Sequence, residues 1–270
     1  MHRREAMAVL GAAAWGAGRA RAADAPLAYS GLDHLEFFVS NIEQSIAFYT
    51  GVFGSGLWKN KRTPRRYLQL GSCYVAFEEA KELRVDHFTA GVEGFDIAAA
   101  HKFFEQRGVA YRDYPSGRDL YLADPDGSRL QLTDSKSWVP LTTNTAAPEA
   151  RPANGEAIFR PVRLDHLLLN VSEPEQAAAF YQEVLGPVSE RANGRIWFKV
   201  GKSRLGLVRT PSGQRVGLNH YCVSVQPFDV ATAAKKLEQA GAKLEPGESA
   251  ASPHFRDPDG YMIQAQAING

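Results

Sequence analysis

The chain has 270 residues, of which 44% are hydrophobic and 23% are charged, and its formal net charge is +1. This composition is typical of a globular protein of one or two domains that is long enough to bury a substantial core. The near balance of charges argues against nucleic-acid binding, which usually needs a strongly basic face. The sequence has no apolar run of about 18 residues, so we expect no membrane span.

The first 25 residues have the layout of an export signal. Arg3 and Arg4 precede a weakly apolar stretch at 6–18, and Ala20-Arg21-Ala22 forms a small-x-small cleavage site. The adjacent arginines and the modest hydrophobicity favour the twin-arginine route. We therefore expect cleavage near Ala22 and a periplasmic or secreted mature protein. The alternative is a disordered basic tail.

The rest of the chain consists of two homologous halves. Leu32-Asp33-His34 returns 132 positions later as Leu164-Asp165-His166. Asp124-Pro125-Asp126-Gly127 returns 133 positions later as Asp257-Pro258-Asp259-Gly260. Proline presets φ in such a turn and glycine tolerates a positive φ, so each motif predicts a tight turn before a last strand.

In chain order, the N-terminal half predicts a strand, a helix and further strands, followed by the same elements again. Helical spacing of apolar residues and cap signals such as Asn41 and Gly108 indicate the helices. The glycines from Gly51 to Gly56 are expected to end the first helix. The expected ranges are 32–39 (strand), 41–49 (helix), 67–70, 73–77 and 85–90 (strands), 96–107 (helix), and 109–111, 120–123 and 129–133 (strands).

The C-terminal half repeats this order, with helices near 174–184 and 229–240. The sequence therefore predicts an α+β protein of four βαβββ modules, with one two-module domain at 31–138 and another at 161–270. The stretch 139–160 is rich in proline and has no periodicity, so we expect a linker or a strap across the surface. Cys73 and Cys222 lie in different halves and are expected to be free, buried thiols.

Each half contains two histidines and one glutamine at nearly the same spacing. The histidines are 53 or 54 residues apart, and the glutamine follows 44 residues after the second histidine. Their matched positions predict two equivalent sites. The two sets are His34, His87 and Gln131 in the N-terminal half, and His166, His220 and Gln264 in the C-terminal half.

Strand alternation predicts where these side chains point. Leu130 and Leu132 share one face of a strand and Gln131 takes the other, because successive side chains alternate. The leucines are expected to pack against helices, so the histidines and glutamines face the space that each sheet encloses. By the same alternation Asp33 and Asp165 are expected on the outer faces, in structural hydrogen bonds.

These motifs resemble the vicinal oxygen chelate superfamily, which includes glyoxalase I, the bleomycin- and fosfomycin-resistance proteins and the type I extradiol dioxygenases. The resemblance covers residues 31–136 and 161–268, and it rests on the module pattern, the Asp-His strand starts, the Phe-Tyr helix ends and the Asp-Pro-Asp-Gly turns. It implies that paired modules curl into half-open barrels around a divalent metal (Fe, Mn, Zn or Ni). The metal would chelate two oxygens of a small substrate.

The resemblance also implies the metal ligands. The extradiol-type positions fall on His34, His87 and Gln131, and on His166, His220 and Gln264. The family's last-strand acid is Glu, whereas Gln keeps an oxygen donor but supplies no charge. This change favours a Lewis-acid role over tight retention of Fe(II). The extra ligand of glyoxalase I would fall near Ala76 and Gly206, which cannot bind metal through a side chain, so glyoxalase I itself is disfavoured.

Five other side chains are candidates for the sites. Glu36 shares the face of the first histidine, either as a metal ligand or in contact with substrate, water or an arginine. Tyr121 and His254 lie ten residues before the glutamines, where type I extradiol enzymes place a substrate-contacting Tyr, and either could transfer a proton. The alternatives are hairpin packing for Tyr121 and a surface loop for His254. Thr89 and Cys222 follow the second histidines by two positions and are expected to line the cavities.

Three functions are compatible with these patterns. The first is a metal-dependent enzyme with an extradiol-dioxygenase layout that acts on a small substrate with vicinal oxygens. The second is a metal-dependent isomerase, epimerase or lyase of the glyoxalase type. The third is a non-catalytic protein that binds a small molecule such as an antibiotic. Family analogy alone favours the C-terminal half as the active one, and a homodimer is one option for the assembly.

Overall fold

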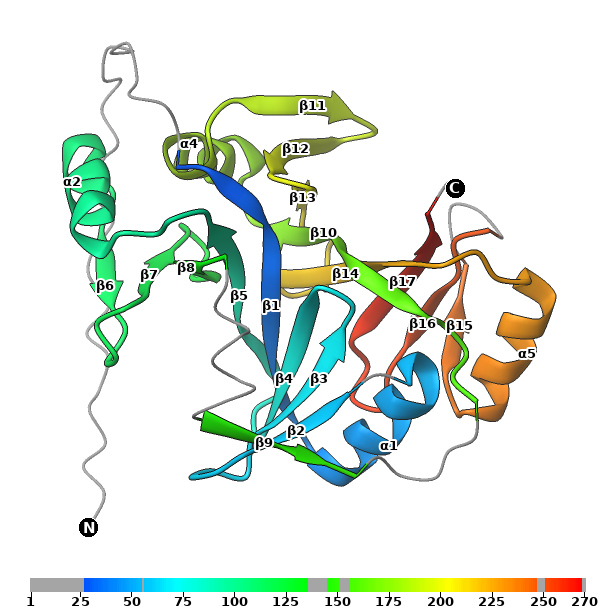
Figure 1. Cartoon of the computed structure of the whole chain (residues 1–270). Helices are drawn as coiled ribbons and strands as arrows, with labels where there is room; N and C mark the ends of the chain where they lie inside the picture. Colours follow the sequence, from blue (N-terminus) through cyan, green and yellow to red (C-terminus); the bar gives the residue numbers. More distant parts are fainter. Residues whose placement is uncertain (1–26, 55, 136–144, 151–155, 247–250, 269–270) are drawn as a thin grey trace.

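Two mixed sheets with flanking helices form an α+β fold (Figure 1). The structure is a computed structural model that describes residues 27–54, 56–135, 145–150, 156–246 and 251–268. The predicted export signal lies outside these residues. Within the described ranges, no helix is long and apolar enough to cross a bilayer.

The N-terminal half contains two βαβββ modules, as predicted. The first module is β1 (Tyr29–Val39), α1 (Ile42–Phe53), β2 (Leu57–Asn60), β3 (Arg66–Leu70) and β4 (Cys73–Glu79). The second module is β5 (Arg84–Val92), α2 (Ile97–Arg107), β6 (Tyr111–Asp113), β7 (Leu120–Ala123) and β8 (Arg129–Asp134). With β9 (Ala146–Glu149) they form one sheet in the order β6-β7-β8-β5-β1-β4-β3-β2-β9. The antiparallel pair β1 and β5 joins the two modules.

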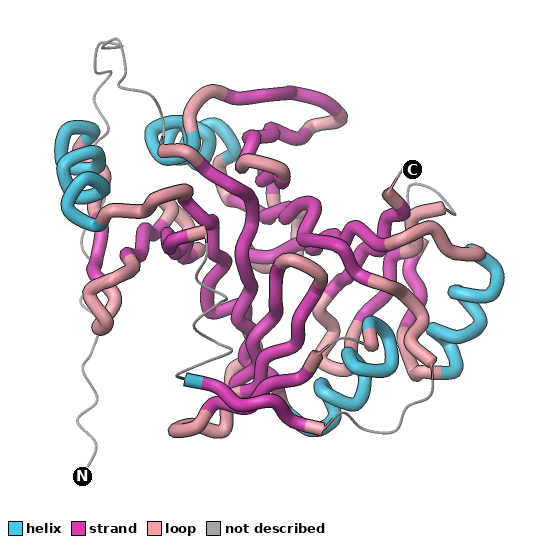
Figure 2. Tube along the Cα trace, viewed as in Figure 1, coloured by secondary structure: helices cyan, strands magenta, loops and turns pink. Residues whose placement is uncertain are grey.

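The C-terminal half repeats this arrangement. Its first module is β10 (Pro161–Val171), α4 (Pro174–Leu185), β11 (Val188–Ala192), β12 (Arg195–Val200) and β13 (Ser203–Arg209). Its second module is β14 (Gly217–Val225), α5 (Val230–Gln239), β15 (Lys243–Glu245), β16 (His254–Arg256) and β17 (Met262–Ala267). The strand order is β11-β12-β13-β10-β14-β17-β16-β15, and neither sheet closes on itself. Figure 2 shows the helices at the outside of the strands.

The first helix is longer than predicted. Gly51 does not break it, because α1 continues to Phe53 and ends at Gly54, which takes a left-handed φ of 61°. A glycine inside a helix costs about 1 kcal/mol relative to alanine. Burial of Val52 and Phe53 in the last turn offsets that cost.

The stretch predicted as a linker contributes a strand. β9 pairs with β2, with Ala146 opposite Asn60 and Glu149 opposite Leu57. Pro148 has no N–H to donate to a ladder, and it is tolerated because β9 lies at the edge of the sheet. This segment therefore covers an edge of the N-terminal sheet as well as connecting the halves.

The two halves share one hydrophobic core. The ring of Phe37 on β1 lies 5.5 Å from the ring of Tyr221 on β14, and buried residues of both halves form a single cluster. The helices pair across the halves, α1 with α5 and α2 with α4 (Figure 1). Cys73 and Cys222 are free and buried, as predicted.

The two Asp-Pro-Asp-Gly turns hydrogen-bond to the opposite half, and we call these contacts the clasp. Tyr49 of α1 donates a hydrogen bond to Asp257 at 2.9 Å, and Tyr181 of α4 donates one to Asp124 at 3.0 Å. The second aspartate of each turn accepts hydrogen bonds from the serine that precedes the same helix. Burial raises the pKa of Asp124 and Asp257 to about 6. Each turn therefore fastens its own half to the first helix of the other half.

Candidate metal and active sites

In the N-terminal half the predicted set comes together on three neighbouring strands. The Nε2 atoms of His34 on β1 and His87 on β5 lie 3.3 Å apart, and both side chains are buried. Thr89 Oγ1 lies 3.0 Å from His34 Nε2 and donates to Gln131 Oε1 on β8 at 3.2 Å. We call His34, His87 and Gln131 the N-terminal site.

The C-terminal half assembles its set in the same way. The Nε2 atoms of His166 on β10 and His220 on β14 lie 3.2 Å apart, and both side chains are buried. Gln264 on β17 donates its Nε2 to Ser252 Oγ at 2.7 Å. Gln264 also raises the pKa of His220 against the larger effect of burial, as an amide oxygen that faces the imidazole does. We call His166, His220 and Gln264 the C-terminal site.

All four histidines are held by the residue that precedes them. In each ring, Nδ1 lies within hydrogen-bond distance of a side-chain oxygen of that neighbour. Because these oxygens accept, Nδ1 carries the proton and Nε2 keeps its lone pair. The distances are 2.6 Å for Asp33–His34, 2.9 Å for Asp86–His87, 2.8 Å for Asp165–His166 and 2.8 Å for Asn219–His220.

Asp33 and Asp165 make hydrogen bonds, as predicted. The prediction placed both residues on the outer faces and did not identify the neighbouring histidine rings as their partners. A register shift in strand pairing lies at each position, between Leu32 and His34 and between Leu164 and His166. Such an irregularity re-aims a side chain. The repeated Asp-His pair was the sequence signal that could have revealed the contact.

The donor set of each half fits a divalent metal. Two nitrogen lone pairs that converge to 3.2 or 3.3 Å repel each other unless a positive charge lies between them. Two imidazole ligands about 2.1 Å from one metal, at an angle of about 90–110°, lie about 3.0–3.4 Å apart. The glutamine oxygen adds a neutral donor. Burial lowers the pKa of His87, and it lowers the pKa of His220 to about 3, so both rings are neutral, as ligands must be.

Glu36 contacts an arginine, which was one of its predicted alternatives. Its carboxylate is buried and lies 2.7 Å from Arg65, which also pairs with Glu78. The nearest oxygen of Glu36 is 3.9 Å from His87 Nε2. Burial raises the pKa of Glu36. The carboxylate is therefore committed to an ion pair at the border of the N-terminal site.

Tyr121 and His254 occupy equivalent places beside the two sites. The ring of Tyr121 lies edge-on to His87 at 5.3 Å between centroids, and the ring of His254 lies edge-on to His220 at 5.4 Å. His254 is not in a surface loop, because it is the first residue of β16 and pairs with Gln264. Burial raises the pKa of Tyr121.

Thr89 and Cys222 differ although they occupy matched positions. Thr89 Oγ1 lies 3.0 Å from Nε2 of His34 on the neighbouring strand. Cys222 is fully buried, and burial raises the pKa of its thiol. Its sulfur and ligand atoms of Asp165 and His166 all lie within 4.8 Å of one another. At this position the C-terminal site therefore has a thiol, a weak hydrogen-bond donor, where the N-terminal site has a hydroxyl.

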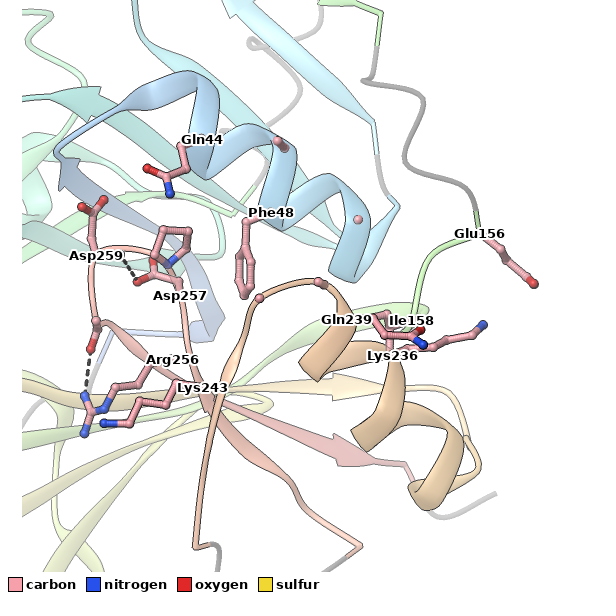
Figure 3. Close-up of a pocket in the computed structure, with 16 residues that line it drawn as sticks. Gln44, Phe48, Glu156, Ile158, Lys236, Gln239, Lys243, Arg256, Asp257 and Asp259 are labelled. Atoms are coloured by element: carbon pink, nitrogen blue, oxygen red, sulfur yellow. Dashed lines mark hydrogen bonds between the residues drawn. The ribbon is translucent and has the colours of Figure 1, made fainter.

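One large groove does not contain the predicted site residues. It has a volume of about 1120 Å³ and lies between α1, α5 and the second Asp-Pro-Asp-Gly turn (Figure 3). Phe48, Lys236 and Arg256 are among its lining residues. A second groove, of about 790 Å³, lies between the two halves and reaches His87.

The chain belongs to the Glyoxalase/Bleomycin resistance protein/Dioxygenase superfamily, whose family model matches residues 31–152 and 163–265. The two matches correspond to the two halves. This assignment confirms the resemblance drawn from the repeated motifs, together with the four-module α+β fold.

Known relatives match one part of the chain. The metallothiol transferase FosB of Bacillus licheniformis is 29% identical over an alignment of 114 residues, with coverage of 38% of this chain and 73% of the relative. The glutathione transferase FosA of Serratia marcescens is 29% identical over an alignment of 111 residues, with coverage of 37% of this chain and 78% of the relative.

Solved structures match nearly the whole chain in fold. The 2,3-dioxygenase LapB from Pseudomonas sp. KL28 has a TM-score of 0.70 and 18% identity, and the match covers 91% of this chain and 94% of LapB. The Mn(II)-bound glyoxalase from Novosphingobium aromaticivorans has a TM-score of 0.68 and 17% identity, with coverage of 89% and 83%. Similarity at this level shows a shared fold.

Proposed function

We propose that this protein is a metal-dependent enzyme of the vicinal oxygen chelate type that acts on a small substrate with two neighbouring oxygens. The observation that carries the proposal is the convergence of Nε2 lone pairs in each half, with every Nδ1 anchored by the preceding residue. Such an outer hydrogen bond orients a metal-ligating histidine and fixes its tautomer. The names of the Mn(II)-bound glyoxalase and the metallothiol transferase support a divalent metal.

The C-terminal site is the working centre in this proposal. In the N-terminal site, Thr89 Oγ1 lies 3.0 Å from His34 Nε2, and the nearby carboxylate is paired with Arg65. In the C-terminal site, Cys222 replaces the threonine, so a thiol takes the place of the hydroxyl oxygen that lies against the first histidine. A proton-transfer group, His254, stands beside His220.

A divalent metal held by His166, His220 and Gln264 would supply Lewis-acid polarisation of the two substrate oxygens. Gln264 contributes a neutral oxygen, so the set carries no ligand charge. Ser252 fixes the amide by accepting from its Nε2, which keeps the oxygen directed at the histidines. Trp197, with its ring 5.4 Å from His166, and Cys222 surround the set with apolar side chains.

His254 moves the proton in this proposal. Its Nδ1 lies 3.1 Å from the backbone oxygen of Ser252, which only accepts, so Nδ1 carries the proton. Nε2 is therefore the basic atom, and it can take a proton from a substrate hydroxyl. Removal of that proton would leave a charged oxygen, which binds a divalent metal more tightly than the hydroxyl does.

Two measurements test the proposal and separate its versions. Elemental analysis of the purified protein should find a stoichiometric divalent metal that is lost in Gln264→Ala and kept in Gln131→Ala. Oxygen uptake with catechol then separates a ring-cleaving dioxygenase from a metal-dependent isomerase, lyase or transferase, which consumes no oxygen. If the purified protein holds no metal and gains none on incubation, the enzyme proposal is contradicted. The remaining alternative is then a binding protein that needs no metal. Its thermal stability should respond to ligand even in the presence of chelator.

We further propose that residues 1–22 direct export by the twin-arginine route. Arg3 and Arg4 with the Ala20-Arg21-Ala22 motif support this proposal. Such a route carries folded protein, so the metal would enter before export. N-terminal sequencing of secreted or periplasmic material should begin at Ala23, and replacing both arginines by lysine should leave the precursor inside the cell.

A further inference from the structure

The groove between the two halves has a lining that resembles a binding site. Its volume of about 790 Å³ is within the range of small-molecule sites, about 300–1,000 Å³. It lies where the first residues of β5 and the segment before β14 meet the two Asp-Pro-Asp-Gly turns. Residues 83 and 216 take equivalent positions in the two halves, so both halves contribute matched surfaces.

The groove carries a strong excess of positive charge. The charged residues that line it are four arginines and one acid, which are Arg84, Arg129, Arg215, Arg256 and Asp126. Asp126 already accepts hydrogen bonds from Ser172. The groove in Figure 3 differs, because its lining is balanced between three basic residues, Lys236, Lys243 and Arg256, and three acidic residues, Glu156, Asp257 and Asp259. Of these two grooves, the groove between the halves therefore favours an anionic ligand.

The four arginines of this groove differ in whether they already form ion pairs. Arg129 pairs with Asp86, and Arg256 lies 2.8 Å from Glu245. Arg84 lies 3.3 Å from Asp86 and is half exposed. Arg215 is exposed, and its guanidinium has no partner among the residues that the structure describes. Arg215 is therefore the cation most available to a ligand.

The same groove gathers apolar surface. Leu83 and Val216 are the exposed large hydrophobic residues of the described chain, at 41% and 44% exposure, and both line this groove. Leu218, Tyr261 and Met262 continue the apolar wall. An apolar patch that is framed by arginines suits a molecule with an apolar body and an anionic group.

We propose that this groove binds a small organic anion with an apolar body, such as an aromatic or aliphatic carboxylate or sulfonate. The anionic group contacts Arg215 and Arg84, and the body covers Leu83 and Val216. The site is separate from the proposed C-terminal metal centre, whose ligands His166, His220 and Gln264 do not line it, and His87 is the one member of the N-terminal site that does.

The test is a fluorescence titration of the full chain with anilinonaphthalene sulfonate, an organic anion with an apolar aromatic body. Wild-type protein should bind it saturably, and Arg215→Glu should raise the dissociation constant on the order of tenfold, since a like charge then faces the sulfonate. Val216→Asp should weaken binding as well. Lys236→Glu makes the same charge change in the groove of Figure 3 and should leave the affinity unchanged.

Thermal unfolding of each variant confirms that it is folded. Repeating the titration with chelator separates this site from the metal centres, and the affinity should not change. The proposal is overturned if the wild type shows no saturable binding, if Arg215→Glu and Lys236→Glu behave alike, or if chelator abolishes binding.

Discussion

The N-terminal and C-terminal sites have the same frame and different surroundings. Both frames consist of two histidines with converging Nε2 atoms and a glutamine on a parallel neighbouring strand. The surroundings differ at four matched positions: Glu36 against Leu168, Asp86 against Asn219, Thr89 against Cys222, and Tyr121 against His254. The strand pairing of the repeated module sets the positions of the histidines and the glutamine. Single side chains around them determine the charge of the site and which group can transfer a proton.

The largest expected difference between the halves concerns proton transfer. His254→Ala should lower kcat by about 10²–10⁴, because a positioned general base contributes about that much. Tyr121→Phe should change kcat by less than about threefold, since a tyrosine with a raised pKa is a poor base at neutral pH. Steady-state turnover of catechol, or of any substrate that the wild type converts, is the measurement.

Metal content is the control for this comparison. Both variants should retain the metal of the wild type, because neither residue is a proposed ligand. A Tyr121→Phe protein that loses as much activity as His254→Ala would place the chemistry in the N-terminal site.

The second difference is the buried ion pair of the N-terminal half. Arg65→Met should lower the free energy of unfolding by about 2–3 kcal/mol, because it leaves the carboxylate of Glu36 buried without its cation. This figure lies below that of a fully buried pair because the Arg65 side chain is 26% exposed. Urea denaturation measures the change.

The matched control removes both partners of the pair. In the C-terminal half Leu168 stands at the position of Glu36, so Glu36→Leu combined with Arg65→Met should recover most of the lost stability. A double variant as unstable as Arg65→Met alone would show that the buried charge is not the cause.

The third prediction uses the turns, in which the two halves are alike. Asp124 and Asp257 have a folded pKa of about 6 against an ordinary value of 3.8. The folded chain therefore binds these protons more tightly than the unfolded chain, and the contribution of each group to stability rises as pH falls from about 7 towards 4. A shift of this size corresponds to about 2–3 kcal/mol for each carboxyl group.

Urea denaturation at pH 7, 6 and 5 tests this linkage. Asp124→Asn and Asp257→Asn should each remove a similar share of the pH dependence, because the two environments match. The hydrogen bond to His87 and the charge of Arg129 lower the pKa of Asp86 to about 2, against the effect of burial. Asp86 therefore stabilises the folded chain when ionised, and this contribution is lost only as the pH falls below about 4. An unchanged slope in both variants would contradict the linkage.

The smallest effect concerns the tyrosines of the clasp. Tyr181→Phe should cost about 1–2 kcal/mol, because it removes the hydrogen bond to buried Asp124. Tyr49→Phe should cost slightly more, since the hydroxyl of Tyr49 also accepts from Tyr221 at 3.0 Å. Equal denaturation midpoints for Tyr49→Phe and wild type would show that the turn is not held by this contact.

The repeat made much of this fold predictable. The fixed offset between halves and the 44-residue interval to each glutamine were sufficient to predict four modules and two equivalent sets, because module geometry is set by local strand and turn signals. The Glu36–Arg65 pair was not predictable, since Arg65 comes from the segment just before β3 and nothing local links it to β1. The role of the clasp aspartates depends on packing between halves, which a local pattern does not report.

The most direct test of the proposed C-terminal centre is equilibrium dialysis of two double-histidine variants against Mn(II) or Zn(II). The His34→Ala, His87→Ala protein should bind the metal as the wild type does, and the His166→Ala, His220→Ala protein should lose it. Circular dichroism confirms that both variants are folded. Metal retained by the second variant and lost by the first would contradict the account and move the centre to the N-terminal half.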